Sequence, residues 1–404
     1  MNEPLLEADS DILTPDALPR GSAKSAIKNE QMLSEISVSR RWLLDQLGRL
    51  LILLLPTLLL AEGFARLLVM TGNPPQSFTG SYDQKAWLAQ SPLEKNKPAI
   101  FVMGDSLTLM AVYSEWMTRK LENEGYHYQV RNLGSLGNTP YLSTVLLEMA
   151  LKKKRRPSLV LFNINHRHFN RHYYRESEHW QVNEGAFRKS YMGECMVGKH
   201  HSWLQNVDCG VKQVSYLARY QAAIQDDIKR LPALFLDPKT VLPPGYFNLP
   251  FVQNEPSKSG WGPAYPVFNQ QEFTQSLAGW TPEKLKLPEN NAYTWDESEF
   301  LAFYRVCQKN HIPLALVWLP EPTEMKDYYQ LNGLQVDSLV ANTAAMGIRL
   351  NLPFLNFRTS DRDVSHYIDR NHLNVMGALT LTERLAQRLE QDALLQRTVE
   401  THRL

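Results

Sequence analysis

The sequence contains too few cysteines for a scaffold built on disulfide bonds. Three cysteines in 404 residues also exclude a zinc site made of four cysteines. An excess of charge is missing too, because 43 Lys and Arg balance 42 Asp and Glu. A near-neutral chain has no general field that attracts polyanions, so we exclude a dedicated nucleic-acid-binding protein. The 43% of hydrophobic and 21% of charged residues are typical of a globular protein.

The sequence also lacks an uninterrupted apolar run long enough to cross a bilayer. Leu50 to Ala61 is apolar over 12 residues, whereas a spanning helix needs about 20. We nevertheless interpret residues 41–70 as a single membrane anchor, because this nearly all-leucine run leaves no polar face. A buried or interfacial helix is the alternative. Arginines before the run predict a cytoplasmic N-terminus and an extracytoplasmic remainder (Arg40, Arg41 and Arg49).

The rest of the chain divides into a tail, a linker and one large domain. We expect residues 1–40 to be a disordered cytoplasmic tail, because they are polar and have little apolar periodicity. Residues 71–97 are interpreted as a linker, because glycine and proline cluster there. The main domain is predicted over 98–396. It contains an insertion at 167–295 with many prolines, in which helical periodicity is convincing only near 211–230.

Short apolar runs alternate with helical patterns in the main domain. The runs predict strands at 99–103, 127–132, 158–162, 313–319 and 353–357. Helices are predicted at 108–124, 141–154, 297–310 and 376–394. This alternation indicates an α/β fold with a parallel sheet that helices cover on both faces.

Polar residues follow the predicted strands at the points where chemistry is usually placed. The sequence Gly-Asp-Ser-Leu at 104–107 puts Ser106 at the carboxyl end of the first strand. Glycine or asparagine N–H groups after the second and third strands, at 132–139 and 163–166, could stabilise an oxyanion. Near the C-terminal end, Asp369 precedes His372 by three residues. If that turn folds back, Asp369 can orient an imidazole that takes a proton from a serine.

These segments together resemble the motif blocks of the SGNH hydrolase superfamily, also called GDSL lipases and esterases. The resemblance implies a three-layer, flavodoxin-like domain with Ser106 as nucleophile and Asp369 and His372 as its partners. It also implies that Gly137 and Asn165 donate to the oxyanion. The third block departs from the family pattern of Gly-x-Asn-Asp, because it has Asn at position 163 and His at position 166. Asn163 is therefore an alternative donor.

The absence of Gly-x-Ser-x-Gly around Ser106 argues against an α/β-hydrolase. We therefore expect a membrane-anchored, extracytoplasmic serine enzyme that acts on O-acyl esters of a small molecule, glycan or polymer. The chain is similar to single-anchor proteins that O-acylate cell-surface polymers, which implies a multispanning membrane acyltransferase as partner. Two alternatives stay open. One is a general GDSL-type carboxylesterase or lipase, and the other is a non-catalytic scaffold of the same fold.

Two further features concern metals and cysteines. Five histidines lie between positions 166 and 201 (His166, His168, His172, His200 and His201). Their acidic and cysteine neighbours are not at metal-ligand spacing, so we expect neither a metal nor another cofactor. Cys195 and Cys209 are 14 residues apart. They form a disulfide if this region is extracytoplasmic, and are otherwise two ordinary thiols.

Overall fold

The computed structural model describes residues 23–70, 78–170, 187, 190–197, 202–219, 274, 295–326, 329 and 335–391. The first 22 residues of the expected tail and most of the insertion at 167–295 lie outside the described residues. The chain divides into two units, one ending at Gly63 and the other beginning at Phe64.

The second unit is built on a five-stranded parallel sheet with the order β2-β1-β3-β4-β5. Its strands are β1 (Ala99–Met103), β2 (Gln129–Asn132), β3 (Leu159–Asn163), β4 (Leu314–Trp318) and β5 (Phe354–Asn356). Phe101 in the central part of the sheet pairs with Arg131 on one side and Val160 on the other. The prediction of an α/β fold with a parallel sheet is confirmed, and the strand order is the flavodoxin-like one.

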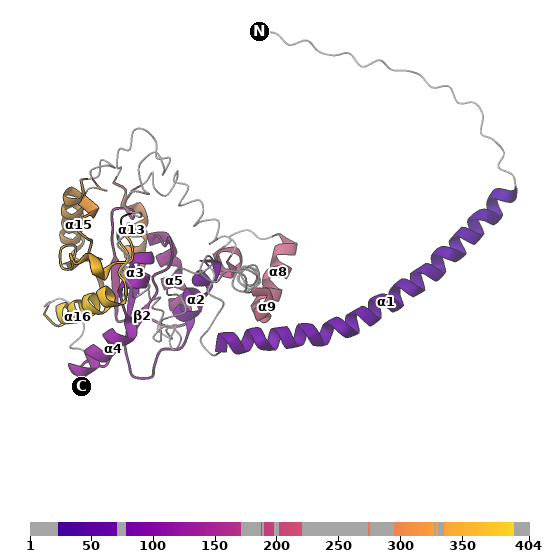
Figure 1. Cartoon of the computed structure of the whole chain (residues 1–404), viewed down its shortest axis with the longest axis horizontal. Coiled ribbons are helices and arrows are strands. Elements are labelled where there is room, and N and C mark those ends of the chain that lie inside the picture. The colour runs from indigo at the N-terminus through magenta and orange to yellow at the C-terminus, as the bar shows by residue number, and fades with distance from the viewer. Residues whose placement is uncertain are drawn as a thin grey trace, which may run out of the picture. The chain divides into compact units, whose positions relative to one another are not determined.

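Helices cover both faces of this sheet and form the outer two layers. One core contains buried residues of α2 (Phe78–Gln90), α5 (Pro140–Lys152), α13 (Ser298–Lys309) and α15 (Val336–Leu350). The other contains those of α3 (Ser106–Ala111), α4 (Ser114–Asn123) and α16 (Val375–Gln391). Figure 1 shows α2 and α5 on one side of β2, with α4 and α16 on the other. Phe101 faces the first core and Val102 the second, which explains why β1 is apolar throughout.

Three elements of the main unit differ from the sequence prediction. The helix expected at 108–124 is interrupted, because Val112 and Tyr113 are extended and the Tyr113 N–H donates to Thr382 Oγ1 on α16. Part of the expected linker, 78–90, is helix α2, whose Tyr82, Ala86 and Ala89 are buried against the core. Helix α15 was not predicted, and its interior asparagine, threonine and glycine are poor helix formers.

The N-terminal helix α1 extends over Ala23–Met70. Residues 23–40 are therefore helical, where a disordered tail was expected. The physical reason is that this stretch has no proline or glycine and contains good helix formers such as Ala, Lys, Glu and Leu. Within the described residues, one helix is long and apolar enough to cross a membrane: Trp42–Arg66, with 25 residues and a mean hydropathy of 1.8. Its leucines are exposed.

The described part of the insertion forms a small helical segment next to α2. It contains a π-helix, η1 (Met192–Val197), followed by α8 (Trp203–Val214) and α9 (Tyr216–Arg219). Helix α8 thus begins before the predicted helix at 211–230, and residues 220–230 lie outside the described residues. A disulfide joins Cys195 to Cys209 with a Cα–Cα distance of 5.4 Å. The two cysteines that the sequence left open are therefore bonded.

Candidate active site

Ser106 lies on a sharp turn between β1 and α3. Gly104 has a φ angle of +150°, and a Cβ atom there would approach Thr108 Oγ1 to 2.2 Å, so only glycine fits. Asp105 is the N-cap of α3, and its carboxylate accepts a hydrogen bond from the Leu107 N–H at 3.0 Å. The turn therefore presents the Ser106 hydroxyl at the carboxyl end of β1.

The turn that carries His372 folds back on itself. Tyr367 and Leu373 form an antiparallel bridge across it, and the Ile368 N–H donates to the His372 carbonyl. Asp369 Oδ1 accepts hydrogen bonds from the Asn371 N–H at 3.0 Å and the His372 N–H at 2.8 Å. This backbone fold brings the Asp369 carboxylate to His372 Nδ1, at 2.8 Å from Oδ2.

Ser106 and His372 meet although they are 266 residues apart in the chain, with 2.9 Å between Oγ and Nε2. With Asp369 on Nδ1, the ring has its proton on that nitrogen and presents a free Nε2 to the serine hydroxyl. Burial alone raises the pKa of Asp369, but the His372 ring and the two backbone donors hold the pKa well below its usual range. The carboxylate therefore stays charged and can stabilise an imidazolium that forms beside it.

Asp105 is the centre of a buried polar network beneath the serine. Its Oδ2 accepts a hydrogen bond from Asn165 Nδ2 at 2.7 Å, and its Oδ1 accepts one from Asn163 Nδ2 at 3.4 Å. All three residues are at least nine-tenths buried. Each asparagine amide has a second N–H. The structure thus places both candidate oxyanion donors beside the residue that precedes Ser106, without distinguishing between them.

His168 borders the same network from the loop after β3. Its Nε2 lies 4.0 Å from Asp105 Oδ2, and its Nδ1 accepts a hydrogen bond from the Asn165 N–H at 3.3 Å. Burial lowers the pKa of His168. The Asp105 carboxylate and the Asn138 backbone act in the opposite direction, but their effect is smaller. A neutral ring fits these contacts, because Nδ1 acts as an acceptor.

Gly137 lies in the loop after β2, which is tied to the serine turn. Its φ angle is +58°, a left-handed conformation that favours glycine. The next residue, Asn138, donates from Nδ2 to the Gly104 carbonyl at 2.9 Å. The structure therefore brings the loops of Gly137, Asn165 and Ser106 to one edge of the sheet, and the donor roles of Gly137 and Asn165 stay predictions.

Sequence reasoning missed two residues that support the serine turn. Asn132 donates from Nδ2 to the carbonyls of Thr108 at 2.8 Å and Val112 at 2.9 Å, and so holds α3. Lys85 on α2 donates to the Asn132 carbonyl at 2.8 Å, and burial lowers the pKa of this lysine to about 7. Asn132 is the first residue of the segment 132–139 that follows the second predicted strand, so its position in that segment could have identified it. Lys85 gave no such signal, because it lies in the expected linker.

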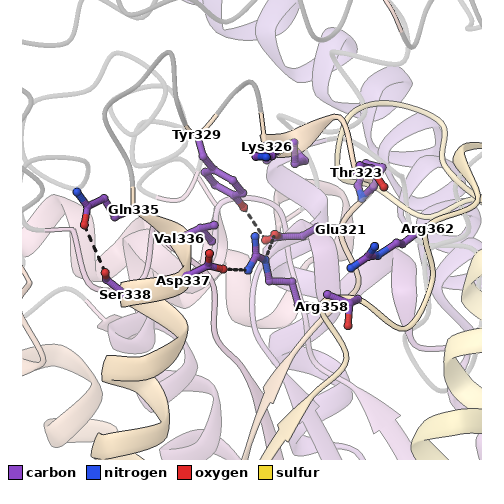
Figure 2. Close-up of a pocket in the computed structure, with 13 residues that line it drawn as sticks. Glu321, Thr323, Lys326, Tyr329, Gln335, Val336, Asp337, Ser338, Arg358 and Arg362 are labelled. Carbon is purple, nitrogen blue, oxygen red and sulfur yellow. Dashed lines mark hydrogen bonds and ion pairs between the residues drawn. The ribbon is translucent and has the colours of Figure 1, made fainter.

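A pocket of about 690 Å³ opens beside β4 and β5. Figure 2 shows Glu321 at its centre, with Arg358 and Tyr329 directed toward it. Glu321 accepts hydrogen bonds from Tyr329 Oη at 2.6 Å and from Arg358 Nε at 3.1 Å. Burial raises the pKa of Glu321, although these two partners act to lower it. Lys326 and Arg362 also line the pocket and are exposed. The pocket therefore combines a largely apolar lining with the charged groups of Glu321, Lys326 and Arg362.

The pocket is not lined by the triad. Neither Ser106, Asp369 nor His372 contributes to its wall. The Tyr329 hydroxyl lies 3.5 Å from His166 Nδ1 with the two rings edge to face. His166 follows Asn165 directly. Tyr329, which lines the pocket, thus contacts the residue that follows Asn165.

Within the described part of the chain, no group of three or more His, Cys, Asp or Glu side chains could hold a metal ion. His172, His200 and His201 lie outside it.

Comparison with known proteins gives matches only at the level of three-dimensional structure. No family model matches the sequence, and no curated protein matches it. A solved structure named as an acylhydrolase from Bacteroides fragilis covers 78% of this chain and 94% of its own, at 14% identity and a TM-score of 0.31. A GDSL-like lipase from Bacteroides thetaiotaomicron covers 78% and 99% at 14% identity and a TM-score of 0.33. These similarities are too low to indicate what the protein does.

Proposed function

We propose that the protein is a serine enzyme of the SGNH type that acts on O-acyl esters through a covalent acyl-enzyme. The observation that carries the proposal is the continuous chain from Ser106 Oγ through His372 to Asp369, with contacts of 2.9 Å and 2.8 Å. This arrangement matches the requirement for an activated nucleophile, namely a base in contact with the hydroxyl and a third group that orients the base.

The reaction follows from these contacts in two halves. His372 Nε2 takes the proton of Ser106 as Oγ attacks the acyl carbonyl, and His372 then gives that proton to the leaving alcohol. The negative charge on the carbonyl oxygen is stabilised by N–H donors at the same sheet edge, for which we propose Gly137, Asn165 and the Ser106 backbone. An acceptor hydroxyl then loses its proton to His372 and attacks the acyl-enzyme, which releases Ser106 in its original state.

The acceptor determines the biological role, and we propose a sugar hydroxyl of an extracytoplasmic glycan or polymer. Two features support an extracytoplasmic site. The candidate span Trp42–Arg66 follows several arginines, and disulfides such as Cys195–Cys209 persist in oxidising compartments. The pocket at Glu321 offers polar and cationic groups for such an acceptor. A multispanning membrane acyltransferase is the proposed acyl donor partner.

Water as the acceptor defines the alternative, a general GDSL-type esterase. The same triad serves both reactions, so the two differ in what reaches the acyl-enzyme. The non-catalytic scaffold predicts a serine separated from its base, and the 2.9 Å contact counts against it.

The direct test is labelling of the purified full chain with a fluorophosphonate, measured by intact mass. We expect one adduct, which is absent in Ser106→Ala and present in Ser298→Ala, a control at an exposed serine of α13. A folded wild-type protein that does not react would overturn the proposal.

Transfer and hydrolysis are separated by a second measurement. The enzyme is given an activated acetyl ester with and without an oligosaccharide, and acetylated sugar and free acetate are quantified. We expect sugar acetylation that depends on Ser106. Release of acetate alone, at a rate that the sugar does not change, would favour the esterase.

A further inference from the structure

Helix α8 has its apolar side on the outside. Five large apolar residues of this helix are exposed, with exposed fractions of 75% for Trp203 and 66% for Val214 (Trp203, Leu204, Val207, Val211 and Val214). Their spacing of three, four and seven residues places them on one face of the helix. A continuous exposed apolar face of this kind indicates a surface that contacts an apolar partner.

The opposite face of α8 attaches the helix to the domain. Cys209 forms the disulfide with Cys195 of η1, and Lys212 pairs with Glu194 of η1 at 2.6 Å. The η1 segment is in turn held by Asp83 of α2, whose carboxylate accepts from the Met192 N–H at 2.8 Å. Because the polar face is fixed by a covalent bond and a salt bridge, α8 cannot rotate its apolar face inward.

The C-terminal end of α8 is bonded to the residue that ends the candidate membrane span. Arg66, the last residue of that span, donates from Nη2 to the Val214 carbonyl at 2.7 Å. Its guanidinium carbon also lies 5.3 Å from the centre of the Tyr216 ring in α9. Ala65 beside it is buried. If the span crosses the bilayer, Arg66 lies at the membrane surface, and the end of α8 lies there with it.

We propose that α8 is an interfacial helix that rests on the bilayer which the N-terminal helix crosses, with its apolar face among the lipids. The proposal rests on the membrane anchor of the proposed function. The bilayer is the occupant that these contacts favour, because the hydrogen bond from Arg66 to the Val214 carbonyl holds the C-terminal end of α8 beside the last residue of the span. Trp203 at the start of the face suits this position, since tryptophan prefers the boundary between lipid and water.

The test uses single introduced cysteines in the full-length chain. Cys195 and Cys209 are bonded and Cys307 is buried, which raises the pKa of its thiol to about 12, so an introduced exposed cysteine is the reactive one. Val207→Cys reports on the apolar face. Gln213→Cys, exposed and on another side of α8, is the matched control. Each variant is labelled with an environment-sensitive fluorophore and reconstituted in phosphatidylcholine vesicles.

We expect the probe at position 207 to emit at shorter wavelength and to lose intensity when the vesicles contain lipid with a doxyl group near the headgroup. The probe at position 213 is expected to show neither effect and to be quenched by iodide. A probe at position 207 that iodide quenches as strongly as at 213 would overturn the proposal. So would a probe protected from both quenchers, which would indicate a protein partner.

A third variant separates this inference from the membrane anchor itself. Leu53→Cys places the probe in the middle of the candidate span, and the vesicles for this variant carry a doxyl group deep in the acyl chain, at the depth where that probe would lie. Doxyl quenching at position 53 but not at 207 would reject the interfacial helix and keep the anchor. Absence of quenching at position 53 would reject the anchor, and the interfacial helix with it.

Discussion

The turn that carries Ser106 and the turn that carries His372 meet at one point but are built in different ways. The serine turn is held by the rest of the domain, because the Asp105 carboxylate and the Asn132 and Asn138 amides bond to groups from several loops. The His372 turn is largely self-contained. Its bridge, its Asp369 contacts and the bond from Tyr367 Oη to the Asp361 carbonyl lie within 13 residues.

The two turns also differ in burial. The Asp105 side chain is 6% exposed, whereas the Asp369 side chain is 34% exposed. A buried polar network loses several hydrogen bonds when one member is removed, and so its members are coupled to folding. A partly exposed carboxylate can be replaced at a smaller structural cost. Loss of a polar group at the serine turn should therefore cost more stability than loss of one at the His372 turn, and loss of the Asp369 carboxylate should act mainly on activity.

The largest expected effect is at Asp369. In Asp369→Asn, the amide no longer stabilises the imidazolium, and we expect kcat on an ester to fall about 10⁴-fold with only a small fall in Tm. Steady-state kinetics and thermal unfolding measure the two quantities. Asp363→Asn, at an exposed carboxylate of the same loop, is expected to retain full activity. A large fall in Tm for Asp369→Asn would contradict a self-contained turn.

The second prediction concerns the pH dependence of stability that Lys85, the donor to the Asn132 carbonyl, should cause. The folded state lowers the pKa of Lys85 from 10.5 to about 7, so between these values the unfolded chain binds a proton that the native protein does not. Stability should therefore rise with pH over this window, by on the order of 5 kcal/mol. Urea unfolding of the wild type and of Lys85→Met measures it. Lys85→Met should lack this rise in stability. Lys97→Met, a control at a surface lysine, should keep it. Equal slopes in all three would contradict the buried lysine.

The third prediction is at Asp105. Asp105→Ala removes the cap of α3 and leaves the Asn165 amide without its acceptor, which should cost about 2 kcal/mol of unfolding free energy. Denaturant unfolding measures this loss. Asp105→Asn keeps a capping oxygen and should recover part of it. If both variants are as stable as the wild type but inactive, the network serves the chemistry alone.

The smallest effect is expected at Tyr367. Tyr367→Phe leaves the Asp361 carbonyl without its donor, at a cost of about 1 kcal/mol, and leaves fluorophosphonate labelling of Ser106 intact. Tyr304→Phe removes a similar bond to the Leu350 carbonyl on the other side of the sheet, and should cost about the same. Loss of labelling in Tyr367→Phe alone would show that the His372 turn depends on this hydroxyl.

Much of the sheet could be predicted, because each buried parallel strand is a short, continuous apolar run. All five strands lie within or at the edges of the predicted ranges. The errors occurred where helices depend on partners distant in sequence. The break at Val112 needs Asn132 and Thr382, and α2 needs the core against which Tyr82 packs. Neither partner is visible in the local pattern.

The sequence by itself determined the order of the motifs, the residue types at each strand end and the apolar span near the N-terminus, because these follow from local composition and spacing. The tertiary structure alone decided that Ser106 and His372 lie within 2.9 Å, that Cys195 and Cys209 are bonded, and that Lys85 and Asp105 lie in buried networks. It also decided which side of α8 faces outward. These outcomes depend on contacts between segments far apart in the chain, and only packing of the whole domain fixes such contacts.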